Sequence, residues 1–325
     1  MTAPSWSANP ATEVLDLRHF SSAALRPVLE EEMQVWSEDL DWDYRSSGEM
    51  ILRYIEGKIL PGYVAVREGR VEGYSFFVYE GSKGVIGDLF VSRELRKQSA
   101  EARLLAHTIA TLQRSPGLQR IEAQLLLYDT GALAQPFYSE GFRQYPRVFM
   151  VSPLNHGPTG RVRAQEFPPD VEVRRWTEQD YHAAAAVITA AYYRHVDAEI
   201  NDQYRSVSGS LRFLNNIVRF PGCGLFDAAA SFVALHRTTR AMLGLILCSR
   251  VKENVGHVTQ VCVLPEQRGR HLGSALLRLT AEELRRRNFK SLTLTVTQAN
   301  ADAIGLYERL GYSIKRVFDA FVWEK

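Results

Sequence analysis

The chain contains the stretch Val261-Cys-Val-Leu-Pro-Glu-Gln-Arg-Gly-Arg-His-Leu-Gly-Ser-Ala-Leu-Leu277. Its apolar start is typical of a buried strand, its glycines and arginines of a tight turn, and its apolar end of an amphipathic helix. Gly269 and Gly273 remove side chains where the backbone turns, so that amide N–H groups at the start of the helix can point at an anion. Arg268 and Arg270 add positive charge. The stretch therefore predicts a cradle for a phosphate group.

A second informative segment is Asn300-Ala-Asp-Ala-Ile-Gly-Leu-Tyr-Glu-Arg-Leu-Gly-Tyr312. It predicts a short helix that ends at Gly311 and leads into a strand. In this order, the two segments resemble the acyl-CoA-binding core of the GNAT superfamily of N-acetyltransferases. The alternative, a dinucleotide-binding turn, requires the glycines in a first βα unit and an acidic residue about 20 positions later, whereas this turn lies near the end of the chain.

The turn of that superfamily reads arginine or glutamine, two residues, glycine, one residue, then glycine or alanine. Arg268 and Gly273 fit this pattern, and His271 departs from it where glycine is more frequent. A histidine amide still donates a hydrogen bond, so the departure affects the conformation of the turn and not the number of donors.

The resemblance implies a mixed α/β fold, with a mainly antiparallel sheet flanked by helices, and acetyl-CoA as cosubstrate. It places the pantetheine arm along the strand before the turn and the pyrophosphate on the turn itself. No metal is expected. The residues expected to bind acetyl-CoA are Val261, Cys262, Val263, Arg268, Gly269, Arg270, His271, Leu272, Gly273, Ser274 and Asn300.

The resemblance also places a phenol, here Tyr307, near the departing sulfur, where a donor stabilises the thiolate. The alternative for Tyr307 is a helix residue that packs on the sheet. The general base is left open. Gln260 stands where many relatives have a carboxylate but cannot accept a proton, and His257 titrates in a useful range or is structural. The early helices of this half, with Tyr192, Tyr193, His195, Asp197, Glu199 and Tyr204, are expected to select the acceptor.

The composition is that of an ordinary globular protein of 325 residues, with 46% hydrophobic and 23% charged residues. Lysine and arginine number 39 against 37 acidic residues, so charge gives no case for a nucleic-acid or membrane partner. Three scattered cysteines predict neither disulfides nor a metal site. The start of the chain has no signal-peptide pattern and no apolar stretch reaches about 18 residues, so a cytoplasmic location is the expectation.

The two halves of the chain match each other in order, which predicts an internal duplication. The matched segments are 15–20 with 171–176, 44–46 with 204–206, 88–96 with 260–268, 102–105 with 274–277, and 137–142 with 307–312. A proline- and glycine-rich stretch between the halves reads as a linker. We therefore expect two tandem GNAT-like domains at 13–152 and 171–325, joined by a linker at 153–170.

The first half lacks the chemistry of the second. Its turn reads Lys97-Gln-Ser-Ala-Glu101, with a carboxylate where Gly273 stands in the second half. Such a carboxylate repels a pyrophosphate. Phe137, opposite Tyr307, has no hydroxyl, although Tyr138 is adjacent. This degenerate copy is expected to shape the acceptor cleft, and its aromatic and acidic cluster at 36–44 is the most suggestive part.

In the second half, the periodicity predicts helices near 178–194, 208–219, 272–287 and 301–309. The predicted strands lie near 171–176, 231–236, 241–250, 257–263, 291–296, 312–317 and 319–324.

Two functions remain open from the sequence. The first is an acetyl-CoA-dependent N-acetyltransferase that modifies a primary amine of a small molecule, with one active site in the second half. The second is a non-catalytic acyl-CoA-binding sensor, since no carboxylate base is evident. The sequence leaves the acceptor, the acyl chain length and the oligomeric state open.

Overall fold

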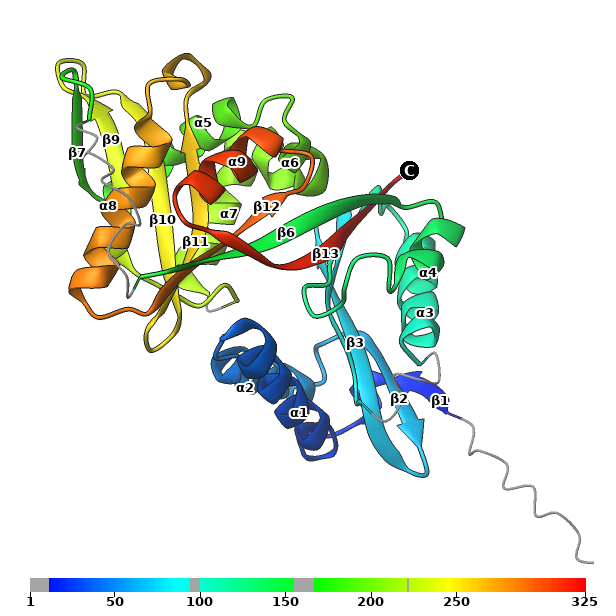
Figure 1. Cartoon of the computed structure of the whole chain (residues 1–325). Coiled ribbons are helices and arrows are strands. Elements are labelled where there is room, and N and C mark those ends of the chain that lie inside the picture. Colours follow the sequence, from blue (N-terminus) through cyan, green and yellow to red (C-terminus); the bar gives the residue numbers. More distant parts are fainter. Residues whose placement is uncertain (1–11, 94–99, 155–166, 221) are drawn as a thin grey trace, which may run out of the picture.

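The computed structural model describes residues 12–93, 100–154, 167–220 and 222–325. Within these ranges, thirteen strands form one twisted sheet that runs through the whole molecule (Figure 1). The strand order is β1-β2-β3-β4-β5-β13-β6-β12-β11-β10-β9-β7, and β8 pairs with β10. Most pairs are antiparallel, and the two parallel pairs are β4 with β5 and β11 with β12. This is the mixed, mainly antiparallel architecture that we expected.

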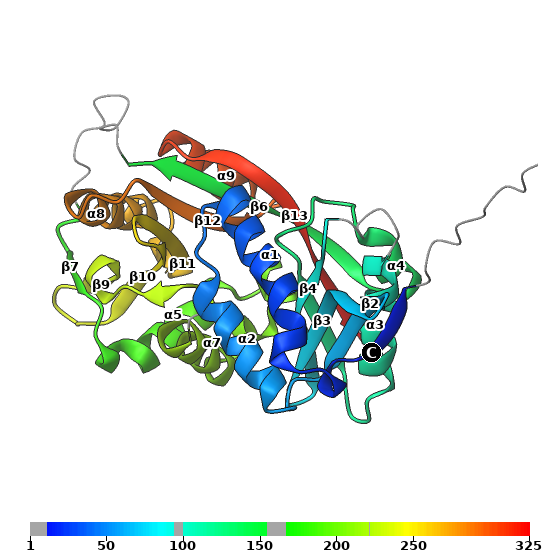
Figure 2. The same ribbon diagram turned by 90° about the horizontal axis from the view of Figure 1, so that it is seen from below.

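The first half covers its part of the sheet with helices on both faces (Figure 2). Helices α1 and α2 lie on one face, and α3 and α4 lie on the other. Its elements are β1 (Glu13–Asp16), α1 (Ser22–Leu40), α2 (Arg45–Glu56), β2 (Gly62–Arg67), β3 (Arg70–Glu80), β4 (Lys83–Val91), α3 (Ala100–Arg114), β5 (Arg120–Gln124), α4 (Ala134–Ser139) and β6 (Arg143–Pro153).

The second half repeats this arrangement, with α5 to α7 on one face of the sheet and α8 and α9 on the other. A 3-10 turn, η4 (Asp202–Arg205), follows α6. Its elements are β7 (Val171–Arg175), α5 (Tyr181–Ala191), α6 (Val196–Ile200), α7 (Val207–Arg219), β8 (Leu225–Phe226), β9 (Phe232–His236), β10 (Met242–Lys252), β11 (Val255–Val263), α8 (Leu272–Arg286), β12 (Ser291–Thr297), α9 (Ala301–Arg309) and β13 (Ser313–Glu324).

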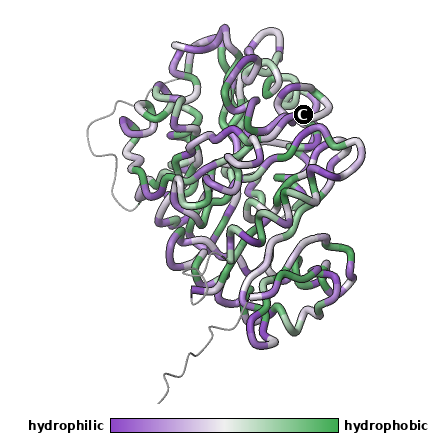
Figure 3. Tube along the Cα trace, turned by 90° about the vertical axis from the view of Figure 1, so that its right-hand side faces the viewer, coloured by the Kyte–Doolittle hydropathy of each residue, from purple (hydrophilic) through white to green (hydrophobic). Residues whose placement is uncertain are grey.

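Hydrophobic side chains on both faces of the sheet explain why the chain forms these layers. Residues 242–249 of β10 are all buried, because α5 and α7 cover one face of the strand and α8 the other. Leu272 and Leu276 of α8 stand four residues apart and face the sheet. Figure 3 shows hydrophobic and hydrophilic residues alternating along the trace, as expected for elements that each bury one side.

The predicted elements of the second half agree with the structure except at two places. Helix α5 stops at Ala191, and Arg194 just beyond it has φ 56°. The two strands expected at 312–317 and 319–324 are one strand, β13, with a bulge between Ile314 and Arg316. The strand continues because β6 pairs with it along its length.

The last strand of each half pairs with the other half. Strand β6 of the first half lies between β12 and β13, and β13 of the second half lies between β5 and β6. Figure 1 shows the two long strands crossing the middle of the molecule side by side. The second half therefore depends on a strand of the first half to complete its sheet, and the first half depends on β13.

The internal duplication is visible in the details of the strands. In the first half Gly87 is bulged between the pairs Phe76–Asp88 and Phe77–Ile86, and in the second half Thr259 is bulged at the corresponding place. The parallel pairs also match. Strands β4 and β5 pair over only four residues, as do β11 and β12, and in each half the two strands then separate.

Candidate active site

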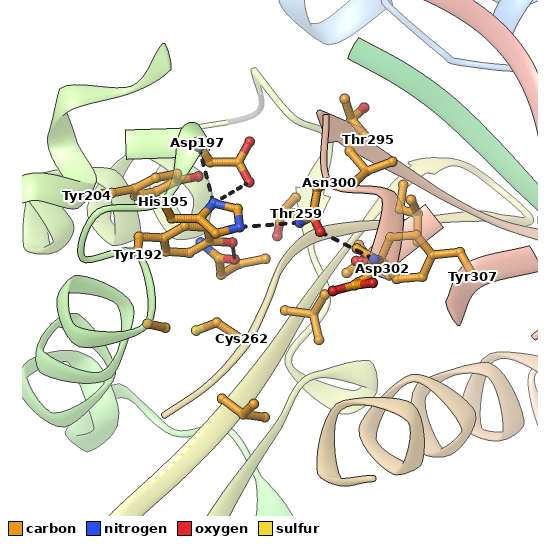
Figure 4. A pocket seen from close by; sticks show the side chains of 18 of the residues that line it. Tyr192, His195, Asp197, Tyr204, Thr259, Cys262, Thr295, Asn300, Asp302 and Tyr307 are labelled. Atoms are coloured by element: carbon orange, nitrogen blue, oxygen red, sulfur yellow. Dashed lines mark hydrogen bonds and ion pairs between the residues drawn. The ribbon is translucent and has the colours of Figure 1, made fainter. Parts of the chain in front are cut away.

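A cavity with a volume of about 440 Å³ opens where β11 and β12 separate (Figure 4). The last pair between these strands is Val258 with Leu294, and the residues after it on both strands line the cavity. The other walls come from the end of α5, α6, η4, the start of α9 and β6. The lining residues are Arg147, Ala191, Tyr192, His195, Asp197, Tyr204, Val258 to Val263, Arg268, Leu294 to Val296, Asn300, Asp302, Ala303 and Tyr307.

The strand expected to hold the pantetheine arm forms one side of the cavity. The β11–β12 pairing ends before Val261, Cys262 and Val263, so the edge of β11 that faces β12 has no strand partner at these residues. Cys262 is buried, and burial raises the pKa of its thiol to about 12. It is therefore a packing residue and not a nucleophile at neutral pH.

The turn that follows has the geometry of an anion cradle. Gly269 has φ 77° and His271 has φ 61°, so the histidine accepts the left-handed conformation that glycine usually adopts. Among the described residues, no acceptor pairs with the backbone amides of 269–274, where α8 begins. A Cβ added to Gly273 meets nothing within 4 Å, so space is open in front of it. Free amides, a helix start and open space together fit a phosphate group.

The arginines of the turn are held in place. Arg268 donates to the carbonyl of Ala191 at 2.8 Å and lines the cavity. Arg270 is paired with Asp170 at 2.5 Å and with the Gln267 side chain at 2.7 Å, so its charge stays beside the turn. Leu272 and Ser274 of the predicted set belong to the first turn of α8 and stabilise it. Leu272 packs in the core, and Ser274 donates to the carbonyl of His271.

Tyr307 and Asn300 lie on the opposite side of the cavity, at α9 (Figure 4). Burial raises the pKa of the Tyr307 hydroxyl, so this side chain remains a hydrogen-bond donor at neutral pH. Asn300 caps α9, because its Oδ1 accepts from the amide of Ala303 at 3.3 Å. Both residues thus line the cavity, on the wall facing β11.

Gln260 lines the floor of the cavity on β11. Its Oε1 accepts a hydrogen bond of 2.7 Å from the hydroxyl of Tyr192, whose ring stacks on Tyr204 at 4.4 Å. Its buried Nε2 has no partner. The hydrogen bond from Tyr192 therefore orients the Gln260 side chain, and the Gln260 Nε2 group remains free to donate a hydrogen bond.

His257, the other candidate base, does not line the cavity. Its ring lies in the core between Trp42, 5.0 Å away, and Phe149, 6.1 Å away. Its Nδ1 lies 2.8 Å from the hydroxyl of Thr293. Burial, and next the charge of Arg147, lower its pKa to about 4. The ring stays neutral and packs the two halves together.

A different histidine faces the cavity. His195 and Asp197 at the start of α6 lie opposite Asn300 (Figure 4). The imidazole Nδ1 lies 3.4 Å from Asp197 Oδ2, and Nε2 lies 3.4 Å from Asn300 Nδ2. The sequence assigned His195 and Asp197 to acceptor selection and not to proton transfer. The sequence signal that could have indicated this pair is a histidine that caps a short helix, with an aspartate two residues later.

The contacts of His195 suit two tautomers. The amide nitrogen of Asn300 donates, so that contact requires the lone pair on Nε2 and the proton on Nδ1, which then faces the Asp197 carboxylate. The backbone amide of Asp197, 3.2 Å from Nδ1, also donates and requires the lone pair on Nδ1. In the first of these tautomers the Nε2 lone pair points toward Asn300.

The first half contributes to this site in two ways. Arg147 on β6 lines the cavity directly, because the strand exchange places β6 beside β12. The first half also holds α6 and η4 through a charged network. Arg120 donates to the carbonyl of Glu199 at 2.5 Å, and the buried Lys83 pairs with Asp202 at 2.5 Å and Glu122 at 3.2 Å. The sequence led us to expect that the first half shapes the acceptor cleft, but it did not indicate these residues, because both contributions depend on contacts between distant strands.

The corresponding place in the first half is filled by side chains. Glu32 and Asp88 are buried together there, and the Tyr74 hydroxyl donates to Glu32 and lies 3.3 Å from Asp88 Oδ2. Tyr44 donates to Asp88 at 2.7 Å. Burial raises the pKa of both acids, and the Asp88 charge raises that of Glu32 further. By the sequence match, Asp88 stands where Gln260 stands in the second half, so acids and phenols occupy the space that is open there.

Other features of the first half support the same contrast. Phe137 stacks on Phe321 at 3.9 Å, and Tyr138 is half exposed and donates to Gln144, so neither matches Tyr307 in placement. Glu101 is buried in the first turn of α3. Residues 97–99 of the expected turn lie outside the described residues.

The aromatic and acidic cluster at 36–44 does not line the cavity. Trp36 stacks on Tyr44 at 4.6 Å, and Trp42 packs on His257. Asp41 pairs with Lys252 at 2.6 Å, and the amide of Asp43 donates to the carbonyl of Val251. The cluster joins α1 and α2 to the end of β10, and the first half reaches the cavity through β6 instead.

Within the described part of the chain, no helix combines the length and the apolar character needed to cross a bilayer. The same residues include no group of three or more histidine, cysteine, aspartate or glutamate side chains placed to hold a metal ion. Cys223, Cys248 and Cys262 are free thiols.

Comparison with known proteins identifies the fold. The family model "Acetyltransferase (GNAT) family" matches residues 193–312. No curated protein sequence matches the chain. A GCN5-related N-acetyltransferase from Sphaerobacter thermophilus is similar in structure, with a TM-score of 0.67 and 17% identity over 99% of this chain and 97% of that one.

Two further solved structures share the fold across nearly the whole chain. One is a tandem GNAT protein from the clavulanic acid biosynthesis pathway, with a TM-score of 0.60, 15% identity, and coverage of 97% of this chain and 98% of that one. The other is a glucosamine N-acetyltransferase region of a fungal β-N-acetylglucosaminidase, with a TM-score of 0.65, 17% identity, and coverage of 98% of this chain and 38% of that one. Residues 193–312 therefore match the GNAT acetyltransferase family, and the whole chain shares the fold of tandem GNAT proteins.

Proposed function

We propose that the protein is an acetyl-CoA-dependent N-acetyltransferase that acts on a primary amine of a small molecule. Its one active site is the cavity between β11 and β12, and the location is cytoplasmic. The observation that carries the proposal is the cavity itself. It brings together the unpaired edge of β11, Arg268 at the start of the amide cradle, His195 and Asp197 on one wall, and Tyr307 on the wall opposite them.

The residues of the second half fit acetyl-CoA. The amides of 269–274 bind its pyrophosphate, with Arg268 and Arg270 close by, and the released edge of Val261 to Val263 pairs with its pantetheine arm. Asn300 lies beside the same arm. Acetyl-CoA supplies an acyl group activated as a thioester.

The protein's own groups then move two protons. His195 Nε2 accepts the proton that the acceptor amine loses as its nitrogen forms the new C–N bond, and Asp197 holds the imidazole in position. As the C–S bond breaks, the Tyr307 hydroxyl donates to the leaving sulfur. Gln260 Nε2, buried and unpaired, is a donor available to the acyl oxygen. The products are an amide and the free thiol of coenzyme A.

The proposal is tested by measuring free thiol release from acetyl-CoA with a panel of primary amines. We expect turnover with at least one small amine, with its acetylated product found by mass spectrometry. Calorimetry should give acetyl-CoA binding in the same preparation. Tight binding without turnover on a broad panel contradicts the proposal and supports an acyl-CoA sensor.

Tyr307→Phe is expected to lower kcat by about tenfold or more, because one donor to the developing thiolate is lost. Acetyl-CoA affinity should change little, since the phenol is not part of the cradle. Tyr312→Phe is the control, because the Tyr312 ring lies 5.8 Å from Tyr307 and does not line the cavity. Equal kcat values for Tyr307→Phe and the unaltered protein would make Tyr307 a packing residue.

One mole of acetyl-CoA is expected to bind per mole of chain. The buried pair of Glu32 and Asp88 fills the first-half counterpart of the cavity, so only the second half has room for the thioester. Calorimetry on the intact chain measures this number. An isolated fragment of residues 165–325 is unsuitable, because it lacks β6 from between β12 and β13. A stoichiometry of two would show that the first half also binds.

A further inference from the structure

Among the described residues of the first half, Arg147 is the one that lines the cavity. It comes from β6, in register with Thr297 of β12 and Phe318 of β13. Its side chain is only 14% exposed. A cation placed this deep in an acceptor cavity has no part in the chemistry described above.

The hydrogen bonds of Arg147 leave one edge of its guanidinium free. Nη1 donates to Gln124 Oε1 at 3.1 Å. Nε is buried and has no partner, and Nη2 lies 4.0 Å from Asp197 Oδ1, beyond hydrogen-bond distance. Nε and Nη2 form the side of the guanidinium that binds a carboxylate through two parallel hydrogen bonds. A buried donor without a partner costs free energy, which an arriving acceptor recovers.

Asp197 forms no hydrogen bond with Arg147. Its Oδ1 accepts from the hydroxyl of Thr297, and its Oδ2 faces His195. Besides Arg147, the charged residues that line the cavity are Asp197, Asp302 and Arg268, and Arg268 is bonded to the Ala191 carbonyl beside the cradle. The acceptor side therefore presents two carboxylates and one cation with a free bidentate edge.

We propose that the acceptor is amino-acid-like, with a carboxylate in the same small molecule as its reacting amine. Arg147 binds the carboxylate through Nε and Nη2, and Asp197 and Asp302 face the amine before it loses its proton. This inference rests on the proposed function, because it names the acceptor class of the same site. It also gives the first half a role in the reaction, as the source of the specificity-determining residue.

The experiment compares matched acceptors in the presence of acetyl-CoA. Each pair consists of an amino acid and the amine that lacks its carboxylate, such as phenylalanine with phenethylamine and lysine with cadaverine. The protein is expected to favour the carboxylated member. Arg147→Met, which keeps the length of the side chain, should lower the ratio of kcat/KM for carboxylated over uncarboxylated acceptor by about tenfold or more. Arg147→Lys should lower it less, because the charge remains and the fork is lost.

Two results would overturn the inference: a preference for the uncarboxylated amines in the unaltered protein, or an equal loss for both members of each pair in Arg147→Met. The second result would mean that Arg147 only balances Asp197. Retained acetyl-CoA affinity and Tm show that each variant is folded. Should Arg147→Met unfold, the ratio in Arg147→Lys decides.

A binding measurement separates this inference from the proposed function. If no acceptor is acetylated, the proposed function fails, and calorimetry with N-acetylphenylalanine and N-acetylphenethylamine then decides the inference alone. Binding of the carboxylated compound that weakens in Arg147→Met and Arg147→Lys supports a carboxylate site. Absent binding, or equal binding of both compounds, contradicts it.

Discussion

Gly273→Glu is expected to abolish acetyl-CoA binding. The new carboxylate would stand in the open space before the free amides of 269–274, where the pyrophosphate is expected to lie. Two like charges about 4 Å apart repel by about 4 kcal/mol at an effective dielectric constant of 20. Gly273 is half-buried, and solvent screening reduces this to a loss of affinity on the order of a hundredfold. Isothermal titration calorimetry measures it.

Gly273→Ala is the matched control for this prediction. Its Cβ meets nothing within 4 Å, so the variant should fold and bind acetyl-CoA nearly as well as the unaltered protein. The pair separates the effect of charge from that of a side chain as such. Unchanged affinity in a folded Gly273→Glu variant would reject the cradle as the cofactor site.

His195→Gln is expected to lower kcat by about a hundredfold, within the range found for general bases. Glutamine keeps a polar group beside Asp197 and Asn300 but cannot carry the proton. The measurement is kcat at saturating substrates, with acetyl-CoA affinity determined in parallel.

His182→Gln controls for the loss of a histidine, because His182 is exposed on α5 and does not line the cavity. Its kcat should match that of the unaltered protein. A His195→Gln variant with full kcat would assign the base elsewhere and leave His195 as part of the acceptor wall.

The sequence predicted the secondary structure around the expected cofactor cradle well because these segments are local. The strand, turn and helix at 261–277 and the helix at 301–309 are continuous segments whose periodicity and glycines determine their shape. The internal duplication could also be predicted from the sequence, and the matching bulges at Gly87 and Thr259 confirm it.

The sequence was a poorer guide to the residues on the expected acceptor side, because that side is assembled from segments far apart in the sequence. His195 faces the cavity since Lys83 and Arg120 of the first half hold the segment that follows it. Arg147 enters through the pairing of β6 with β12, and strand pairing partners are not encoded in local periodicity. For the same reason, the sequence pointed to His257 as a candidate base and to His195 only for acceptor selection, although His195 and not His257 lines the cavity.

The exchange of last strands also determines when the fold can close during synthesis. Strand β5 leaves the ribosome early, but its neighbour β13 (Ser313–Glu324) follows every other described strand in the sequence. Until that segment emerges, β5 and β6 each present an unpaired edge, which is a template for pairing with other chains. A chain that stops before Ser313 never closes either edge. The integrity of the first half thus depends on a strand, Ser313–Glu324, that is synthesised after all of its own strands.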